Sequence, residues 1–368
     1  MAVLDLIDLK LVEFTYFITF CVLIYSVVSA SICAYLICVL FLYICLKVIR
    51  KKSTGTIENK HQGIFITGCD TGFGHDLARR LDNLKFTVFA GCLHPEGDGA
   101  RKLKAASSKR LHVIPLDVGS DESVEAAHDY VVKHLPESGL WAIVSNAGFN
   151  VMGDVELCTV NLYKKVMNVN YFGAIRTIRN FMYLVRKNKG RAVIVSSVRG
   201  RFPYPADSAY HVTKHGLETM ADSLRLEMLK FGVQVSIIEP GAFGAATASQ
   251  SEHVLKRYRE EADEMWQAAS EDVRKTYGRK YIDAVIAKQE GVLTGSATTT
   301  KPVIDALEDA IVSTRPHTRY LVDGGGWFDP DTTLARYYDY LPTWFSDWII
   351  IQSTCCDRFP DYKKLKLD

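Results

Sequence analysis

The sequence of 368 residues is 48% hydrophobic and 23% charged, and its 44 Lys and Arg against 42 Asp and Glu give a formal net charge of +2. This balance excludes the strongly basic composition of a nucleic-acid-binding protein, so no nucleic-acid partner is expected. None of the nine cysteines forms a Cys-x2-Cys pair, so the sequence predicts neither a metal site nor a disulfide framework. Length alone suggests two domains, although α/β folds of this size also occur as one.

An uncharged apolar segment occupies residues 14–46, after a short leader at 1–13. A membrane-spanning helix needs roughly 20 apolar residues, so this segment predicts one long, tilted transmembrane helix, with a tight hairpin as the alternative. It is too long for the core of a cleaved signal, and it lacks the arginines of a mitochondrial transit peptide. We therefore expect it to remain as a membrane anchor.

A basic linker follows the anchor at residues 47–60, and its Lys and Arg residues contrast with the acidic residues of the leader. By the positive-inside rule, the catalytic part of the chain is expected to face the cytosol. The endoplasmic reticulum is the expected membrane, and a mitochondrial membrane is the alternative.

A glycine-rich turn opens the predicted catalytic domain, which we place at residues 61–324. An apolar run at 63–67 predicts a buried strand, and the glycines after it allow a tight turn with close backbone approach to a pyrophosphate. The N-terminus of the next helix then offers unpaired amide donors to the phosphates. The residues expected to line this turn are Gly68, Thr71, Gly72, Phe73 and Gly74.

Two later strands end in polar or small residues that suit a dinucleotide. The strand at 111–116 is followed by Asp117, whose carboxylate suits an adenine amino group. The strand at 141–145 leads into a small-residue turn at 146–148, against which a cofactor could lie. Each signal alone is also common in ordinary turns, so their order along the chain carries the prediction.

The strongest chemical signal is the pair Tyr210 and Lys214, which lie four residues apart and share one face of a predicted helix. A phenol titrates at about pH 10, and a neighbouring ammonium lowers that pKa toward neutrality. Ser197 follows an apolar strand and can hold a substrate oxygen beside the phenol, and Asn170 can orient a water or a backbone carbonyl. Together these side chains predict a site for proton transfer between an alcohol and a carbonyl.

Seven candidate strands begin near residues 64, 88, 113, 143, 193, 235 and 320, with helical patterns between most of them. This alternation predicts an α/β fold, a Rossmann-type doubly wound parallel sheet. The insertion at 242–300 is rich in helix formers and is expected to be a helical substrate cap or, alternatively, a plain packed helical pair. The C-terminal segment at 325–368 is aromatic and apolar in part, which suits a membrane interface, a pocket wall or burial against its own domain.

In this order, the motifs resemble those of the short-chain dehydrogenase/reductase family over residues from about 60 to 320. Residues 68–74 and 88–93 are similar to a membrane-anchored branch that contains D-beta-hydroxybutyrate dehydrogenase, the retinol dehydrogenases and the type 2 hydroxysteroid dehydrogenases. Residues 239–247, 275–283 and 301–306 look most like the hydroxybutyrate enzyme.

The resemblance implies that Tyr210 is the general acid or base, that Lys214 lowers its pKa and bonds the nicotinamide ribose, and that Ser197 polarises the carbonyl or aligns the alcohol. Asn170 would hold a water in a proton relay, and a homodimer is compatible with the family. A hydride moves between the substrate and the nicotinamide cofactor, so the protein mainly supplies position and electrostatics. The expected cofactor contacts are Gly68, Thr71, Gly72, Phe73, Gly74, Leu93, Asp117, Val118, Asn146, Ala147, Gly148, Tyr210, Lys214, Pro240 and Gly241.

NAD is expected rather than NADP. Asp70 in the glycine turn would repel a 2′-phosphate, and no basic residue lies within that turn. Residues 92–94, after the second strand, carry neither the acid typical of NAD enzymes nor the arginine typical of NADP enzymes.

The substrate is expected to be a lipophilic alcohol or ketone of the steroid or retinoid class, because a cytosol-facing anchor suits a molecule that partitions into the bilayer. An apolar wall would then be formed by Phe149, Met152, Phe202, Tyr204 and Phe243. The alternative is a 3-hydroxybutyrate-type hydroxy acid, whose carboxylate would need a cation such as Arg199 or Arg201. A catalytically silent, dinucleotide-binding membrane scaffold is the second alternative.

Overall fold

The computed structural model describes residues 14–20, 22–23, 35, 37–44, 55–247, 252–294, 296–324 and 329–355. The predicted leader, much of the predicted anchor at 14–46 and most of the basic linker therefore lie outside the described residues. In the part of the chain that is described, no helix combines the length and the hydropathy needed to cross a membrane.

Two compact units make up the chain. The smaller one contains Met1–Ile57 and Ser313–Arg315, and the larger one contains Glu58–Val312 and Pro316–Asp368. In the smaller unit, Thr56 and Ser313 form an antiparallel bridge, and the Thr314 amide donates to the Gly55 carbonyl at 2.8 Å.

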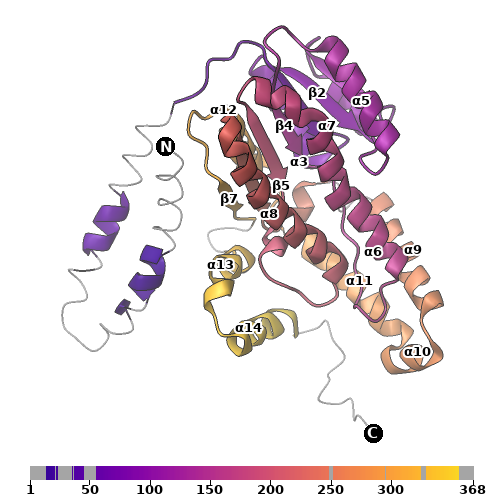
Figure 1. Cartoon of the computed structure of the whole chain (residues 1–368). Helices are drawn as coiled ribbons and strands as arrows, with labels where there is room; N and C mark the ends of the chain where they lie inside the picture. Colours follow the sequence, from indigo (N-terminus) through magenta and orange to yellow (C-terminus); the bar gives the residue numbers. More distant parts are fainter. Residues whose placement is uncertain are drawn as a thin grey trace. The chain divides into compact units, whose positions relative to one another are not determined.

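The larger unit is built on a seven-stranded sheet with the order β3-β2-β1-β4-β5-β6-β7. All neighbouring strands pair in parallel, and the order reverses between β1 and β4, which confirms the predicted doubly wound sheet (Figure 1). Buried runs of apolar residues form most of these strands, because both faces of the sheet are covered. The strands are β1 (Gly63–Thr67), β2 (Thr87–Cys92), β3 (Leu111–Pro115), β4 (Leu140–Ser145), β5 (Arg191–Val195), β6 (Gln234–Pro240) and β7 (Arg319–Val322).

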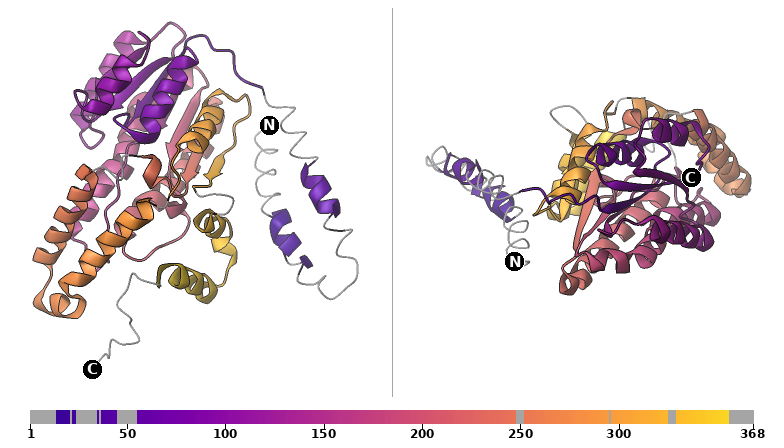
Figure 2. Two further views of the ribbon diagram at one scale, coloured as in Figure 1. Left: turned by 180° about the vertical axis from the view of Figure 1, so that it is seen from behind. Right: turned by 90° about the horizontal axis from the view of Figure 1, so that it is seen from above.

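Helices cover both faces of the sheet, as the two further views show (Figure 2). On one face, α3 and α12 pack against each other and against the strands. On the other face, α5, α7 and α8 enclose the main core, where the rings of Phe65 and Phe181 stack with centroids 4.1 Å apart. These helices and their neighbours are α3 (Gly72–Asn83), α4 (Asp98–Ala105), α5 (Asp121–His134), α6 (Val160–Met167), α7 (Gly173–Lys187), α8 (Ser208–Met228) and α12 (Lys301–Val312).

Short helical turns connect several of these elements. The π-helical turn η1 (Asn168–Phe172) joins α6 directly to α7. The turn η2 (Val198–Gly200) follows β5, η3 (Leu229–Phe231) ends α8, and η4 (Gly244–Ala246) follows β6. The β5–α8 connection, which contains η2, leads to the candidate catalytic helix.

The predicted helical insertion is formed by α9 (Glu252–Ala268), α10 (Glu271–Tyr277) and α11 (Arg279–Thr294). Helices α9 and α11 contact each other and share a second apolar core, the cap core, with α6 and the loop after β4. Figure 1 shows this group extending past one end of the sheet. Its function as a substrate cap stays a prediction.

The C-terminal segment folds into α13 (Pro330–Tyr337), η6 (Tyr338–Tyr340) and α14 (Thr343–Cys355). Leu334 and Ile350 pack with Val198 and Phe202 in a third apolar cluster, the C-terminal core. Trp344, in contrast, is 72% exposed. Part of this segment is therefore buried against its own domain, and its role at a membrane interface or as a pocket wall stays a prediction.

Candidate active site

The turn between β1 and α3 depends on its glycines. Gly68 and Gly72 have φ angles of +73° and +63°, which side chains disfavour. A Cβ on Gly68 would lie 2.8 Å from Ala147 Cα, and one on Gly74 would lie 2.2 Å from the Gly68 carbonyl oxygen. Thr71 precedes α3 but makes no side-chain cap hydrogen bond, so the amides of the first helical turn face outward without that cap.

The ends of β1 and β4 are tied together beside this turn. Thr67 Oγ1 accepts hydrogen bonds from the amides of Asn146 and Ala147, each at 3.0 Å. Asn146 Nδ2 donates in return to the carbonyls of Thr67 at 2.9 Å and Gly68 at 3.0 Å. The predicted small-residue turn thus meets the glycine turn at the point where the strand order reverses, which is where α/β sheets bind ligands.

Asp70 extends from the glycine turn to the end of β2. Its carboxylate accepts hydrogen bonds from the amides of Leu93 at 2.9 Å and His94 at 2.8 Å. The acid that the sequence of the β2 end lacks is therefore supplied by the loop after β1. Sequence reasoning identified Asp70 but did not place it at this position.

Asp117 follows β3 and is exposed. One of its carboxylate oxygens accepts from the Gly119 amide at 2.8 Å, which leaves the second oxygen for the predicted contact with an adenine. Val118 is buried and would contact a Cβ on Gly173. At the end of β6, the Gly241 amide donates to the Val322 carbonyl at 2.9 Å. The predicted cofactor contacts of these residues stay predictions.

The four candidate catalytic residues come from two elements, α8 and η1, and from one loop, which converge at the carboxyl end of the sheet. Tyr210 and Lys214 lie on α8, and Lys214 Nζ is 5.4 Å from the centroid of the Tyr210 ring. Lys214 Nζ also donates to the Val195 carbonyl, at the end of β5, at 3.0 Å. Ser197 Oγ, in the loop after β5, donates to the Pro240 carbonyl at 3.3 Å. The predicted group is thus brought together.

Asn170 lies in the π-helical turn η1 and is 1% exposed. Its Oδ1 accepts from the Phe149 amide at 2.9 Å, and its Nδ2 donates to the Phe149 carbonyl at 2.8 Å and to Thr213 Oγ1 at 3.1 Å. Thr213 Oγ1 donates in turn to the Tyr210 carbonyl at 2.7 Å. Asn170 therefore connects the loop after β4 to the catalytic helix, and its predicted role in a water relay stays a prediction.

This geometry agrees with the comparison to known families. The chain matches the family model of the short chain dehydrogenases over residues 62–256. It belongs to the short-chain dehydrogenase/reductase family.

Curated members of this family cover most of the chain. D-beta-hydroxybutyrate dehydrogenase, mitochondrial, of Bos taurus is 43% identical over 263 residues, which are 70% of this chain and 76% of the relative. Retinol dehydrogenase 7 of Rattus norvegicus is 35% identical over 86% of this chain and 96% of its own. 17-beta-hydroxysteroid dehydrogenase type 6 of Homo sapiens is 36% identical over 79% of this chain and 88% of its own. The protein is accordingly a short-chain dehydrogenase, an oxidoreductase that acts on CH–OH groups with a nicotinamide dinucleotide.

In this short-chain dehydrogenase, burial raises the pKa of the Tyr210 phenol above its ordinary value, and the Asp207 carboxylate raises it further, against the Ser197 hydroxyl and the Arg199 guanidinium. Burial also lowers the pKa of the Lys214 ammonium to about 8. The expectation that the phenol pKa falls toward neutrality is wrong for this arrangement. Desolvation penalises both charged forms, and it is the largest cause of each pKa shift.

The two arginines considered for a substrate carboxylate are both engaged. Arg201 donates from Nε at 2.6 Å and from Nη2 at 3.0 Å to the two carboxylate oxygens of Glu239, which is 0% exposed. The Arg199 guanidinium lies 3.8 Å from the centroid of the Tyr204 ring, and its Nη2 is 3.4 Å from Asp331 of α13. These contacts speak against Arg201 as a ligand of a substrate carboxylate, whereas Arg199 Nη1 has no hydrogen-bond partner among the described residues.

The predicted apolar wall divides between separate clusters. Met152 and Phe149 belong to the cap core, where the Arg257 guanidinium lies 4.7 Å from the Phe149 ring centroid. Phe202 and Tyr204 belong to the C-terminal core. Phe243 is buried and meets the ring of Phe73 edge-on at 5.7 Å, so it lies at the glycine turn. In the C-terminal core, Phe202 and Tyr204 pack with Leu334 and Ala335 of α13.

Sequence reasoning missed two polar residues beside the phenol. Asp207 is 6% exposed and immediately precedes α8, and its Oδ1 has no hydrogen-bond partner among the described residues. Its Oδ2 lies 3.4 Å from His211 Nε2. Tyr258 of α9 is 3% exposed, and its charge also influences the Tyr210 pKa. The position of Asp207 three residues before the tyrosine was the only available signal.

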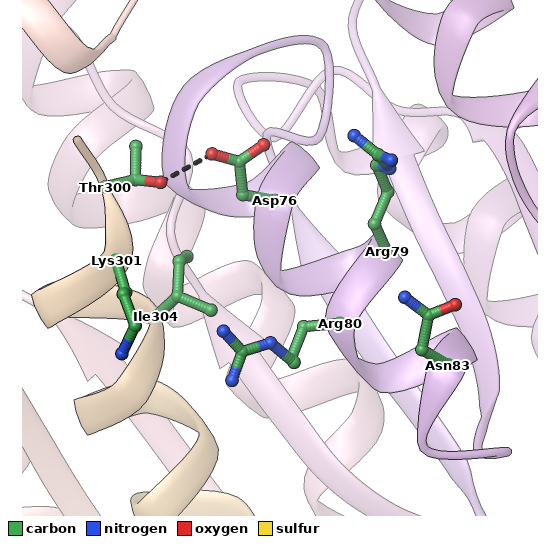
Figure 3. A pocket seen from close by; sticks show the side chains of 7 residues that line it. All are labelled: Asp76, Arg79, Arg80, Asn83, Thr300, Lys301 and Ile304. Atoms are coloured by element: carbon green, nitrogen blue, oxygen red, sulfur yellow. Dashed lines mark hydrogen bonds between the residues drawn. The ribbon is translucent and has the colours of Figure 1, made fainter. Parts of the chain in front are cut away.

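A separate cavity of about 240 Å³ lies between α3 and α12 (Figure 3). Thr300 Oγ1 donates to Asp76 at one side of it, at 2.6 Å. Its arginines and lysine are largely paired with acidic residues of α12, and none of the candidate catalytic residues lines it. The lining residues are Asp76, Arg79, Arg80, Asn83, Thr300, Lys301 and Ile304.

Proposed function

We propose that this short-chain dehydrogenase interconverts an uncharged, lipophilic alcohol of the steroid or retinoid class and its carbonyl, using NAD. The observation that carries this proposal is the charge around Tyr210. The buried Asp207 carboxylate has an unpartnered oxygen among the described residues, while Arg201 is engaged by Glu239. An anionic substrate at the phenol would meet this carboxylate, whose effect on the Tyr210 pKa is larger than the opposing effect of the Arg199 guanidinium.

The relatives support both an uncharged and an anionic substrate. Those named for retinol and for 17-beta-hydroxysteroids align with 79–86% of the chain. The relative named for D-beta-hydroxybutyrate is the more similar in identity, at 43%, over 70% of the chain. A 3-hydroxybutyrate-type hydroxy acid is therefore the second candidate, and the catalytically silent scaffold is the third.

The residues present fit a nicotinamide dinucleotide, because Gly68 and Gly74 permit the tight turn at which its pyrophosphate would lie, and a Cβ on either would collide with neighbouring backbone. Asp70 supports NAD as the partner. Its carboxylate stands at the end of β2, where an acid bonds the ribose 2′-hydroxyl in dinucleotide-binding folds and a 2′-phosphate would be repelled.

When bound, the nicotinamide donates or accepts the hydride. Tyr210, held mainly as the neutral phenol by its raised pKa, donates its proton to the carbonyl oxygen in reduction and takes it back from the alcohol in oxidation. The Ser197 hydroxyl hydrogen-bonds the same substrate oxygen and fixes its position beside the phenol. Asn170 holds the loop after β4 against α8, so that the two halves of the site keep their spacing.

The N-terminal segment suggests how a lipophilic substrate reaches the site. Residues 14–46 carry no charge and precede a basic linker, so we propose a membrane anchor with the catalytic unit on the cytosolic side of the endoplasmic reticulum. A mitochondrial membrane is the alternative, since one group of relatives is named as mitochondrial. A homodimer is proposed from the family alone.

The test uses the full-length chain in lipid nanodiscs and follows NADH absorbance with a steroid alcohol, a retinoid alcohol and 3-hydroxybutyrate, each with NAD and with NADP. Turnover of a lipid alcohol, at least tenfold faster with NAD, is expected. Turnover of 3-hydroxybutyrate alone would overturn the proposal in favour of the second candidate. Tyr210→Phe should abolish turnover and keep NADH binding; unchanged turnover in that variant would show that the reaction occurs elsewhere.

A further inference from the structure

Two helices of the structure begin at a buried aspartate, and the two carboxylates are used differently. Asp329 precedes α13 and Asp207 precedes α8, and each is 6% exposed. The Asp329 carboxylate accepts hydrogen bonds from the amides of Asp331 at 2.9 Å and Thr332 at 3.2 Å, which cap the helix. It also accepts from the Gly324 amide at 2.8 Å. Asp207, in contrast, makes no side-chain hydrogen bond to its helix, so it does not supply the cap that an aspartate normally supplies at this position.

One carboxylate oxygen of Asp207 lacks a partner altogether. Oδ1 is buried and has no hydrogen-bond partner among the described residues. Oδ2 lies 3.4 Å from His211 Nε2, which is not aligned for a hydrogen bond. His211 is held from its other side, where Nδ1 lies 2.8 Å from the Arg199 carbonyl oxygen. A buried acceptor without a partner costs free energy, so Oδ1 requires a donor from elsewhere.

The backbone holds Asp207 between the loop after β4 and the catalytic helix. The Gly153 amide donates to the Ala206 carbonyl at 2.8 Å, and Gly153 and Asp207 form a parallel bridge. Ala206 has a φ angle of +58°, which is uncommon for a residue with a side chain. Strained backbone of this kind is concentrated at functional sites. The position of Asp207 is thus fixed by the fold and is not a free choice of the loop.

The carboxylate lies near two phenols. Asp207 precedes Tyr210 by one helical turn, so the two side chains leave the same face of the helix, with Cβ atoms about 5–6 Å apart. Burial raises the Tyr210 pKa, and Asp207 is the next largest cause of this rise. Burial also raises the pKa of Tyr258 of α9 to about 12, and Asp207 adds to that rise against the Arg257 guanidinium. The Asp207 carboxylate therefore faces both the catalytic helix and the cap.

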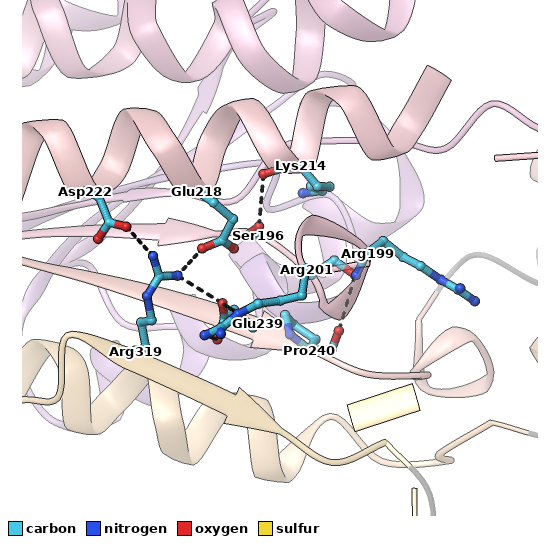
Figure 4. Close-up of polar contacts among 10 residues, drawn as sticks. Ser196, Arg199, Arg201, Lys214, Glu218, Asp222, Glu239, Pro240 and Arg319 are labelled. Carbon is cyan, nitrogen blue, oxygen red and sulfur yellow. Dashed lines mark hydrogen bonds and ion pairs between the residues drawn. The ribbon is translucent and has the colours of Figure 1, made fainter. Parts of the chain in front are cut away.

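The arginines of the loop before α8 are directed to other groups. Arg201 binds Glu239 of β6 within a network of charged side chains (Figure 4). Arg199 points away from that network, and its guanidinium lies 3.8 Å from the centroid of the Tyr204 ring. A donor for Asp207 Oδ1 therefore has to come from water or from a bound molecule.

We propose that Asp207 is a specificity-determining residue that accepts a hydrogen bond from a second hydroxyl of the substrate, close to the hydroxyl or carbonyl that reacts. The preferred substrate is then a lipophilic diol or hydroxyketone rather than a simple alcohol. This inference rests on the proposed function, because an uncharged substrate offers a hydroxyl as its donor. A site with a buried acceptor discriminates strongly against an analogue that lacks the matching hydroxyl.

The test compares kcat/KM with NAD for two pairs of alcohols, using the full-length protein in nanodiscs. The pairs are estriol with estradiol and 2,3-dodecanediol with 2-dodecanol, and the members of each pair differ by one hydroxyl next to the reacting carbon. The diol of a pair that reacts is expected to be preferred by about tenfold or more, the effect of a hydrogen bond to a charged acceptor. In Asp207→Leu, which removes both oxygens, this preference should fall to about twofold or less. The ratio does not depend on the Tyr210 pKa, because both alcohols react at the same phenol.

The outcomes separate this inference from the proposed function. Equal kcat/KM for diol and simple alcohol, or a preference that Asp207→Leu keeps, would mean that water alone satisfies the oxygen, and would overturn only the inference. Faster turnover of 3-amino-2-dodecanol than of the diol would overturn the hydroxyl in favour of an ammonium. Turnover of 3-hydroxybutyrate alone would overturn both, since that acid has a single hydroxyl.

A second measurement needs no substrate. If Asp207 serves binding rather than folding, Asp207→Leu should raise the melting temperature of the ligand-free protein by about 2–4 °C, measured by circular dichroism in nanodiscs. Asp329→Leu is the matched control, because it removes an equally buried aspartate that makes three backbone hydrogen bonds. It should lower the melting temperature by at least as much. An unchanged or lower melting temperature in Asp207→Leu would show that this carboxylate supports the fold, and would overturn the proposal.

Discussion

Asn170 and Phe149 form two hydrogen bonds with each other, from the Phe149 amide to Asn170 Oδ1 at 2.9 Å and from Asn170 Nδ2 to the Phe149 carbonyl at 2.8 Å. The pair joins η1 to the loop that enters the cap core, and a third bond reaches Thr213 on the catalytic helix. Loss of the Asn170 amide would leave buried backbone groups of that loop without partners.

Asn170→Ala is therefore expected to lower the free energy of unfolding by about 3 kcal/mol, measured by urea denaturation with tryptophan fluorescence. Asn180→Ala, which removes one hydrogen bond to the Arg176 carbonyl on α7, is the control and should cost about 1 kcal/mol or less. Equal losses in the two variants would contradict the linking role of Asn170.

Asp70→Asn should broaden the use of cofactor. Removing the charge at the end of β2 while keeping an acceptor for the Leu93 or His94 amide should raise the ratio of kcat/KM for NADP to that for NAD by about tenfold, or about 1.4 kcal/mol. Steady-state kinetics with both cofactors measure the ratio. Asp98→Asn, which changes an exposed carboxylate at the start of α4, is the control and should leave the ratio of kcat/KM values unchanged. If Asp70→Asn gave the same ratio as this control, Asp70 would not be the residue that selects NAD.

Asp207→Asn should move the pH dependence of alcohol oxidation to lower pH. The negative charge of Asp207 raises the pKa of Tyr210, so its removal lowers that pKa and more phenolate is present at a given pH. The acid limb of the kcat/KM profile should shift down by about one unit. Asp129→Asn, on an exposed side chain of α5, serves as the control. A shift toward higher pH would mean that Asp207 stabilises the phenolate instead.

Gly74→Ala should weaken NADH binding by about tenfold or more. The added methyl would lie 2.2 Å from the Gly68 carbonyl oxygen and 2.7 Å from Asn146 Nδ2, so the glycine turn must open. NADH fluorescence titration measures the loss. Gly55→Ala, where the nearest described atom would be 3.8 Å away, should bind NADH normally, and normal binding by Gly74→Ala would show that the turn tolerates this opening.

The strand positions and the glycine turn could be predicted because their residue patterns are local. Most strands are buried on both faces and form apolar runs. The predicted strand starts lie within three residues of those observed, from residue 64 against Gly63 to residue 143 against Leu140. The close approach at Gly74 likewise follows from a turn that neighbouring residues define. Family resemblance then identified the catalytic set as a group.

The remaining features depend on contacts between residues far apart in the chain. Asp70 lies at the end of β2 because β1 and β2 are neighbours in the sheet, which its own sequence context does not encode. Arg201 was a candidate for a substrate carboxylate only because its partner Glu239, 38 residues later, was not known to face it. The pKa of Tyr210 is raised mainly because the fold buries the phenol. The four-residue spacing of Tyr210 and Lys214 in the sequence does not reveal that burial.

The π-helical turn η1 has a consequence for the helix that contains it. One extra residue in a helical turn rotates everything after it by about 100° about the helix axis. Leu162 and Val166, before the turn, lie in the cap core, whereas Ile178 and Phe181, after it, lie in the core against the sheet. A single inserted residue thus changes the phase of the continuous helix formed by α6 and α7, so that its first half packs into the cap core and its second half packs against the sheet.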